Sequence, residues 1–132
     1  MREGQQLHVH NSAPIAHNVK WDGGRLKNPG SNVIIPANGN VNIKLNADKA
    51  PIAISCNIHP WMKGWVRVFD HPYFAVTDEN GNFEIKNAPA GKLKMIIWQE
   101  DMGFKGGEAG KDGSPITVKA GDNDQGVIKI KP

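Results

Sequence analysis

Apolar and polar residues alternate with a period of two along much of this chain. The alternating segments are Leu7–His10, Val41–Leu45, Val66–Val68, Phe83–Ile85 and Ile116–Val118. This period places one row of side chains on an apolar face, as in a half-buried strand. Two continuous apolar runs, Val33–Ile35 and Met95–Trp98, predict strands that are covered on both faces. No segment carries a convincing helical period, so the pattern predicts an almost entirely β structure.

Turn-forming residues separate these segments at short intervals. The Asn80–Gly81 pair lies between the runs Phe74–Thr77 and Asn82–Ile85 and is the sharpest hairpin signal in the chain. The glycine-rich stretch Met102–Ser114 predicts a mobile surface loop. About ten short strands in 132 residues indicate a β-sandwich or a β-barrel.

Composition and charge narrow the class of protein. The chain carries 16 Lys+Arg against 13 Asp+Glu, and the basic residues are scattered, so we expect no nucleic-acid partner. No apolar run approaches the ~18 residues of a membrane span, and no signal peptide is visible. The single cysteine, Cys56, excludes an internal disulfide framework and any metal centre that needs two thiolates from this chain.

The segment Ser55–Met62 carries the most informative chemistry. Cys56, His59 and Met62 follow one another at spacings of three residues, and His17 offers a second imidazole upstream. Two imidazoles and a thiolate with a weak axial thioether are the ligands of a blue-copper site. A Cys/His/His set also suits tetrahedral zinc, although copper binds such sites more tightly. Met62 has a second interpretation, because methionine also fills irregular gaps in a core.

His17-Asn18-Val19 followed by Cys-x2-His-x2-Met resembles the cupredoxin family, most closely its amicyanin-type copper loop. The resemblance covers about residues 4–70. It implies a Greek-key β-sandwich in which His17, Cys56 and His59 are equatorial copper ligands and Met62 is the axial one. It also implies that Asn18 ties the two ligand loops together, that Asn11 closes the preceding strand, and that Pro60 and Trp61 lie where electrons leave and a partner docks.

Residues 64–100 resemble a carboxypeptidase-regulatory-like β module, and the two patterns together resemble methylamine-utilisation-like cupredoxin proteins. We therefore expect a copper-binding part over residues 1–70 and a β-hairpin extension over 71–132. A cupredoxin normally starts with two strands more than are visible here. Three explanations stay open: the chain is a fragment, the C-terminal hairpins complete the same sandwich, or a neighbouring chain does so through the vacant sheet edge as a homo-oligomer.

The resemblance implies a type 1 copper protein with one copper ion that carries single electrons and is not an enzyme. The neighbours of Cys56 are Ser55 and Asn57 rather than the histidine that multicopper oxidases place there, and a binuclear copper centre would need a second cysteine. We expect a redox protein partner (a cytochrome, dehydrogenase or other oxidoreductase) and a periplasmic or extracellular location. The alternative is a copper-binding scaffold module of a larger extracytoplasmic protein, without a carrier role.

The remaining histidines favour plainer interpretations. His8 and His10 share one face of a strand, and a His-x-His pair can bind metal, so this pair is the candidate for a second site. Two exposed strand histidines without a ligand are the simpler interpretation. We expect His71 to occupy a turn.

Overall fold

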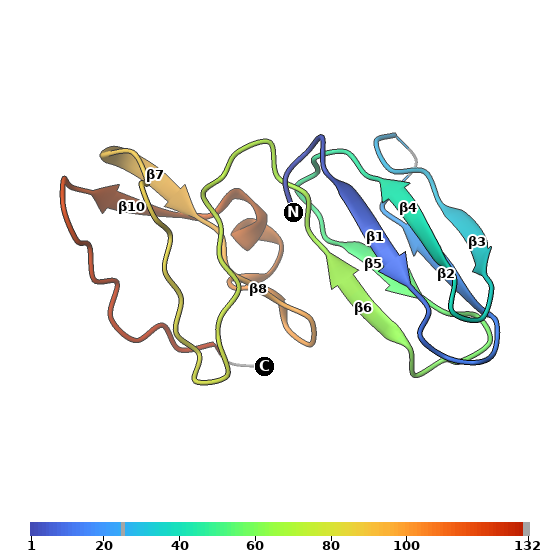
Figure 1. Cartoon of the computed structure of the whole chain (residues 1–132). Coiled ribbons are helices and arrows are strands. Elements are labelled where there is room, and N and C mark those ends of the chain that lie inside the picture. The colour runs from blue at the N-terminus through green and yellow to red at the C-terminus, as the bar shows by residue number, and fades with distance from the viewer. Residues whose placement is uncertain (25, 131–132) are drawn as a thin grey trace. The chain divides into compact units, whose positions relative to one another are not determined.

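A computed structural model describes residues 1–24 and 26–130 of the chain. The chain divides into two compact units, Met1–Pro72 and Tyr73–Pro132. Strands β1 to β6 lie in the first unit, and β7 to β10 lie in the second (Figure 1). The strands are short and pair in antiparallel sheets, which confirms the predicted all-β class.

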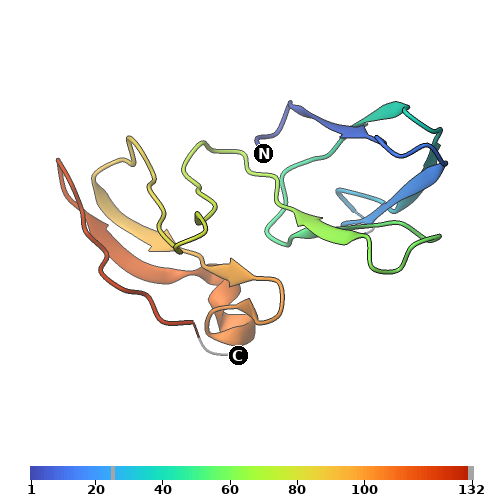
Figure 2. The same ribbon diagram turned by 60° about the horizontal axis from the view of Figure 1, so that its bottom comes forward.

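Among its described residues, the first unit contains two sheets. The larger sheet has the order β3 (Ser31–Ile35), β2 (His17–Asp22), β5 (Ile52–Ser55) and β6 (Lys63–Val66). The smaller sheet pairs β1 (Gln6–His10) with β4 (Asn40–Lys44). Figure 2 shows these sheets as two layers, and the core between them contains Val19, Ile35, Ile43, Leu45, Ile52 and Val68.

Alternation in β1 explains how the smaller sheet covers the core. Leu7 and Val9 pack against the core cluster, whereas His8 and His10 are exposed on the opposite face. This is the half-buried arrangement that a period of two predicts.

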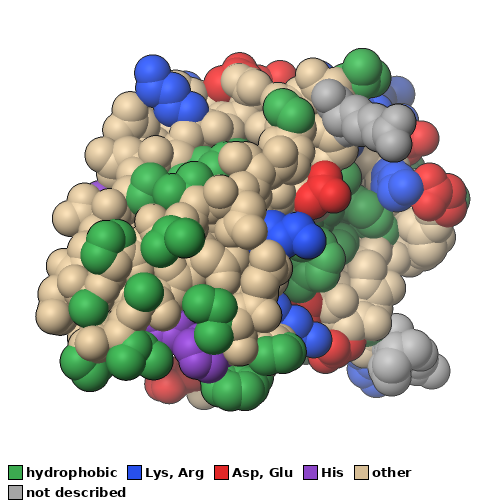
Figure 3. Space-filling model, turned by 90° about the vertical axis from the view of Figure 1, so that its right-hand side faces the viewer, with side chains coloured by type: hydrophobic (Ala, Val, Ile, Leu, Met, Phe, Trp, Pro, Cys, Tyr) green, Lys and Arg blue, Asp and Glu red, His purple; other side chains and the backbone are tan. Residues whose placement is uncertain are grey.

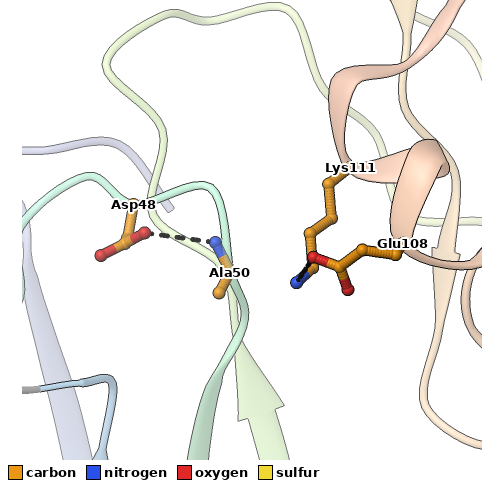
Figure 4. Close-up of polar contacts among 4 residues, drawn as sticks. All are labelled: Asp48, Ala50, Glu108 and Lys111. Atoms are coloured by element: carbon orange, nitrogen blue, oxygen red, sulfur yellow. Dashed lines mark hydrogen bonds and ion pairs between the residues drawn. The ribbon is translucent and has the colours of Figure 1, made fainter.

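Polar side chains hydrogen-bond to the backbone of the loops that connect the strands of the first unit. The amide of Asn28, itself buried, donates to the carbonyl of Asn46 (3.0 Å) and accepts from its N–H (2.7 Å). The Asp48 carboxylate accepts from the N–H of Ala50 (3.3 Å) just before β5 (Figure 4). These bonds satisfy backbone groups that no strand pairs.

As far as residue 130, the second unit contains two small antiparallel sheets and one short helix. Strand β7 (Gly91–Met95) pairs with β10 (Ser114–Val118), and β8 (Trp98–Gln99) pairs with β9 (Gly103–Phe104). The 3-10 helix η1 (Gly107–Asp112) carries an ion pair between Lys111 and Glu108 one turn apart (Figure 4). Within the described residues, no helix is long and apolar enough to cross a membrane.

The hairpin predicted around Asn80–Gly81 is a turn without flanking strands. Residues 74–77 and 82–85 are not strands in the structure. The turn itself forms, because the Asp78 carboxylate accepts from the N–H groups of Asn80 (2.9 Å) and Asn82 (2.8 Å). Gly81 follows in the left-handed region with φ 82°. The local carboxylate closes the turn, so the turn signal does not require a ladder on either side.

Four other predictions are wrong in part. The alternating segment Val66–Val68 is a strand only at its first residue, because β6 ends at Val66. The predicted loop Met102–Ser114 contains β9 and η1. The run Val33–Ile35 is a strand, but it is not covered on both faces, since Ile34 is 73% exposed. The run Met95–Trp98 is interrupted, because β7 ends at Met95 and β8 begins only at Trp98.

Removing the side chain of Ile52 tests where the core lies. Ile52 is fully buried at 0% exposure, so Ile52→Ala should lower the free energy of unfolding by about 2–5 kcal/mol. Ile34→Ala is the matched control, because Ile34 is also in a strand but exposed, and its cost should stay below about 1 kcal/mol. Denaturant unfolding followed by circular dichroism measures both, and equal losses would contradict the assigned core.

Candidate metal centre

The pairing of β2 with β5 brings two distant parts of the chain to one end of the larger sheet. Lys20 lies opposite Ser55 in this antiparallel register. His17 begins β2, and Cys56 directly follows β5. Because antiparallel strands run in opposite directions, the first residue of β2 and the residue after β5 lie at the same edge.

The loop from Cys56 to Met62 closes on itself through its backbone. The N–H of Cys56 donates to the carbonyl of Met62 (2.9 Å), and the N–H of Met62 donates to the carbonyl of His59 (2.9 Å). These bonds fold His59 back over Cys56, and the chain then enters β6 at Lys63.

Three donor atoms form a compact triangle at this end of the sheet. The sulfur of Cys56 lies 3.8 Å from Nδ1 of His17 and 3.8 Å from Nδ1 of His59. The two Nδ1 atoms lie 3.0 Å apart. Within the described residues, His17, Cys56 and His59 form a group of side chains that could hold a metal ion.

The triangle has the size that a metal ion needs. A point equidistant from the three atoms lies about 2.1 Å from each, close to the 2.0–2.3 Å of metal–imidazole and metal–thiolate bonds. An ion at this point would have three ligands around it in one plane, which is the trigonal arrangement of two imidazoles and a thiolate. The donor set therefore fits a single ion without rearrangement of these three side chains.

Asn18 connects the ligand-bearing segments. Its Oδ1 accepts from the N–H of Asn57 (2.9 Å) and, when Cys56 is a thiol, from its sulfur (3.2 Å). Its Nδ2 donates to Oδ1 of Asn32 on β3 (2.8 Å). Asn18 is only 7% exposed, so these bonds satisfy both ends of a buried amide and hold it in one orientation.

The surroundings of Cys56 favour the thiolate. Burial raises the pKa of the thiol, but hydrogen bonds from the Asn18 backbone, from the rings of His17 and His59 and from the His59 backbone lower it to about 6, from 9.0. A thiolate is the form that binds a metal ion.

Asn11 fixes the loop that leads to His17. Its buried amide group donates to the carbonyls of Ile15 (2.8 Å) and Pro36 (2.9 Å), and its Oδ1 accepts from the N–H of Ala13 (3.0 Å). The loop before β2 is therefore bound to the end of β3. This places His17 by several hydrogen bonds rather than by strand pairing alone.

Met62 lies at the same end of the unit but is not placed as a ligand by any contact of its sulfur. It is 43% exposed and lines a pocket of about 430 Å³ together with His17, Asn18 and Cys56. Its backbone closes the loop, as described above. The axial role of Met62 stays a prediction.

Exposed apolar residues flank the ligands along the chain. The ring of Trp61 lies 5.2 Å from the ring of His59, and Trp61 is 76% exposed. Pro60, Ile58 and Ile15 are exposed as well. Figure 3 shows histidine at the surface among hydrophobic side chains at the lower edge of the view.

Comparisons with known proteins add no assignment: no family model, no curated protein and no solved structure matches this chain. What the structure defines is an all-β protein with a His–Cys–His cluster able to hold a metal ion.

Sequence reasoning missed Asn32. It is an exposed polar residue of a strand, and nothing in its neighbourhood along the chain distinguishes it. Its contact with Asn18 arises only from the pairing of β2 with β3. His8 and His10 lie outside the cluster, on the exposed face of β1.

The acidity of Cys56 is a direct test of the cluster. In the metal-free protein the thiol should titrate with a pKa of about 6, because three neighbouring residues favour the thiolate. The pKa is lower in the folded chain than in the unfolded chain, so the free energy of unfolding should rise from pH 6 to pH 9. The ultraviolet absorbance of the thiolate measures the midpoint.

His17→Gln should raise this midpoint, because a hydrogen bond that favours the thiolate is lost. His71→Gln, at a histidine outside the cluster, is the control and should leave it unchanged. A midpoint near pH 9 in the unsubstituted protein would show that the rings do not face the sulfur as described.

Proposed function

We propose that this protein is a type 1 copper protein of the cupredoxin kind that carries single electrons. The observation that carries this proposal is the triangle of Cys56 Sγ and the Nδ1 atoms of His17 and His59, whose sides are 3.8, 3.8 and 3.0 Å. Copper bound there would supply one-electron chemistry, by alternating between Cu(II) and Cu(I).

The donor set supports copper over zinc. A thiolate is a soft ligand that suits Cu(I), and imidazole suits both oxidation states. Copper also stands above zinc in intrinsic affinity for such sites.

The rigidity of the ligands supports electron transfer. Asn18 and the backbone bonds of the Cys56 loop fix the ligand-bearing segments through the protein's own hydrogen bonds. Side chains that keep one arrangement in both oxidation states lower the reorganisation that accompanies gain or loss of an electron. Hydrogen bonds to a cysteine sulfur also tune the potential of such a centre.

The surroundings of His59 support exchange with a protein partner. The half-buried His59 ring contacts exposed Trp61, and the apolar residues Ile58 and Pro60 beside it in the loop are exposed as well. An apolar patch of this kind is typical of a docking surface. We infer a redox protein as the partner, electron exit at Trp61 and Pro60, no catalytic role, and a periplasmic or extracellular location.

Copper titration tests the assignment. One equivalent of Cu(II) added to the metal-free protein should produce an intense visible band and a narrow copper hyperfine splitting, because the thiolate donates charge to Cu(II). Cys56→Ser should abolish the band and retain at most a pale complex. An equally strong band in Cys56→Ser would contradict the site.

Voltammetry of the loaded protein separates a carrier from a copper-binding scaffold. A carrier should show a reversible one-electron wave. If copper binds but is not reduced and reoxidised reversibly, the electron-carrier function is wrong and the protein is a copper-binding scaffold.

Replacing Met62 tests the axial ligand. Met62→Leu should keep the visible band and raise the reduction potential, because a weak donor that stabilises Cu(II) is removed. Met102→Leu, in the second unit, is the matched control and should leave the potential unchanged. Equal potentials in Met62→Leu and the unsubstituted protein would exclude Met62 as an axial ligand.

A further inference from the structure

The outward face of the β1–β4 sheet presents two histidines that the candidate metal centre does not use. His8 and His10 are both exposed and are separated by one residue of β1. Alternate residues of a strand point to the same side and lie about 6.7 Å apart. Two imidazoles at that separation can turn toward a single ion, since metal–nitrogen bonds are about 2.0–2.1 Å long.

The neighbouring strand prepares His8 to be a ligand. Nδ1 of His8 lies 2.8 Å from Oδ1 of Asn42, its partner in the β1–β4 register. An amide oxygen only accepts, so Nδ1 carries the hydrogen and donates it. The lone pair then lies on Nε2, the atom free to bind a metal. Metal-binding histidines usually donate their second ring N–H to such an oxygen, and its loss typically weakens metal affinity by about 10–100-fold.

The polar groups of this face select the class of ion. The residues opposite His8 and His10 are Asn42 and Asn40, and Lys44 lies opposite Gln6, so no carboxylate takes part in this register. Hard cations such as Mg²⁺ and Ca²⁺ prefer carboxylate and carbonyl oxygens. Two neutral imidazoles with water favour borderline divalent ions, and among these Cu(II) binds most tightly.

His10 also connects this face with the candidate metal centre. It lines the same pocket as Asn11, His17, Cys56 and Met62. The outward face of β1 and the pocket of the His17–Cys56–His59 cluster therefore share the residue His10, at the end of β1.

We propose that His8 and His10 form a second, solvent-exposed Cu(II) site, at which the ion is held before it enters the pocket. The site itself is independent of the proposed electron-carrier function, but its role in loading rests on that function. The transfer is an exchange of imidazole and water ligands at Cu(II), with no change in oxidation state.

Counting copper ions tests the site. Isothermal titration calorimetry and EPR spectroscopy of the His17→Gln, Cys56→Ala protein, in which the cluster keeps only the imidazole of His59, should still show one Cu(II) in a tetragonal nitrogen and oxygen environment. Adding His8→Gln and His10→Gln to this protein should remove that signal. Asn42→Ala should weaken Cu(II) binding by about 10–100-fold.

Matched controls separate a built site from adventitious binding to any exposed histidine. His71→Gln removes an exposed histidine elsewhere, and Asn40→Ala removes the amide opposite His10; neither should change the tetragonal signal. An unchanged signal in the His8→Gln, His10→Gln protein would overturn the site. A signal that His71→Gln removes would also overturn it.

Loading kinetics test the role of the site. With Cys56 present, the visible band after mixing with one equivalent of Cu(II) should appear at least several-fold more slowly in the His8→Gln, His10→Gln protein, and should reach the same final intensity. An equal rate would overturn the loading role. If no band forms in any protein, the proposed type 1 centre fails, whereas the copper count in the His17→Gln, Cys56→Ala protein still decides the second site.

Discussion

The pairing of β2 with β5 is the constraint on which the metal centre depends. His17 and Cys56 are 39 residues apart in the chain, and only this register places the start of β2 beside the end of β5. Val19 on β2 and Ile52 on β5 belong to the buried core cluster, so the same two strands that carry His17 and Cys56 are also anchored in the core. Burial of these apolar side chains therefore stabilises the geometry of the ligands as well as the fold.

The hydrogen bonds of Asn18 fix the two ligand-bearing segments relative to each other. Asn18 follows the first ligand along β2, accepts a hydrogen bond from the Asn57 N–H in the other ligand loop, and donates to Asn32 on β3. Both ends of this buried amide are hydrogen-bonded, so rotation of the side chain would break at least one hydrogen bond. Leaving a buried polar group without a partner costs about 1–3 kcal/mol. The position of the cysteine loop is thus coupled to the third strand of the sheet, beyond the strands that carry the ligands.

Sequence patterns predicted strands well where one face of a strand meets the core. The segments around Leu7–His10, Val41–Leu45 and Ile116–Val118 are strands because their alternation matches burial. The patterns gave wrong predictions where side-chain hydrogen bonds or glycine conformations, rather than strand pairing, set the local structure. Asp78 closes its turn by accepting backbone N–H groups, and Gly103, Gly106 and Gly107 adopt positive φ angles, so the glycine-rich stretch folds into a short strand and a helical turn.

The sequence by itself determined the β class, the three-residue spacing of Cys56 and His59 within one tight loop, and the types of donor atom. These properties are local, because a turn of a few residues brings its own side chains together. The family resemblance already predicted His17 as a ligand, and the tertiary structure brings it within 3.8 Å of the Cys56 sulfur. Only the tertiary structure decided that Asn32 holds Asn18, that Ile34 faces solvent, and that His10 lines the pocket of the cluster. Each of these depends on strand register or sheet packing between distant segments, which no short stretch of sequence encodes.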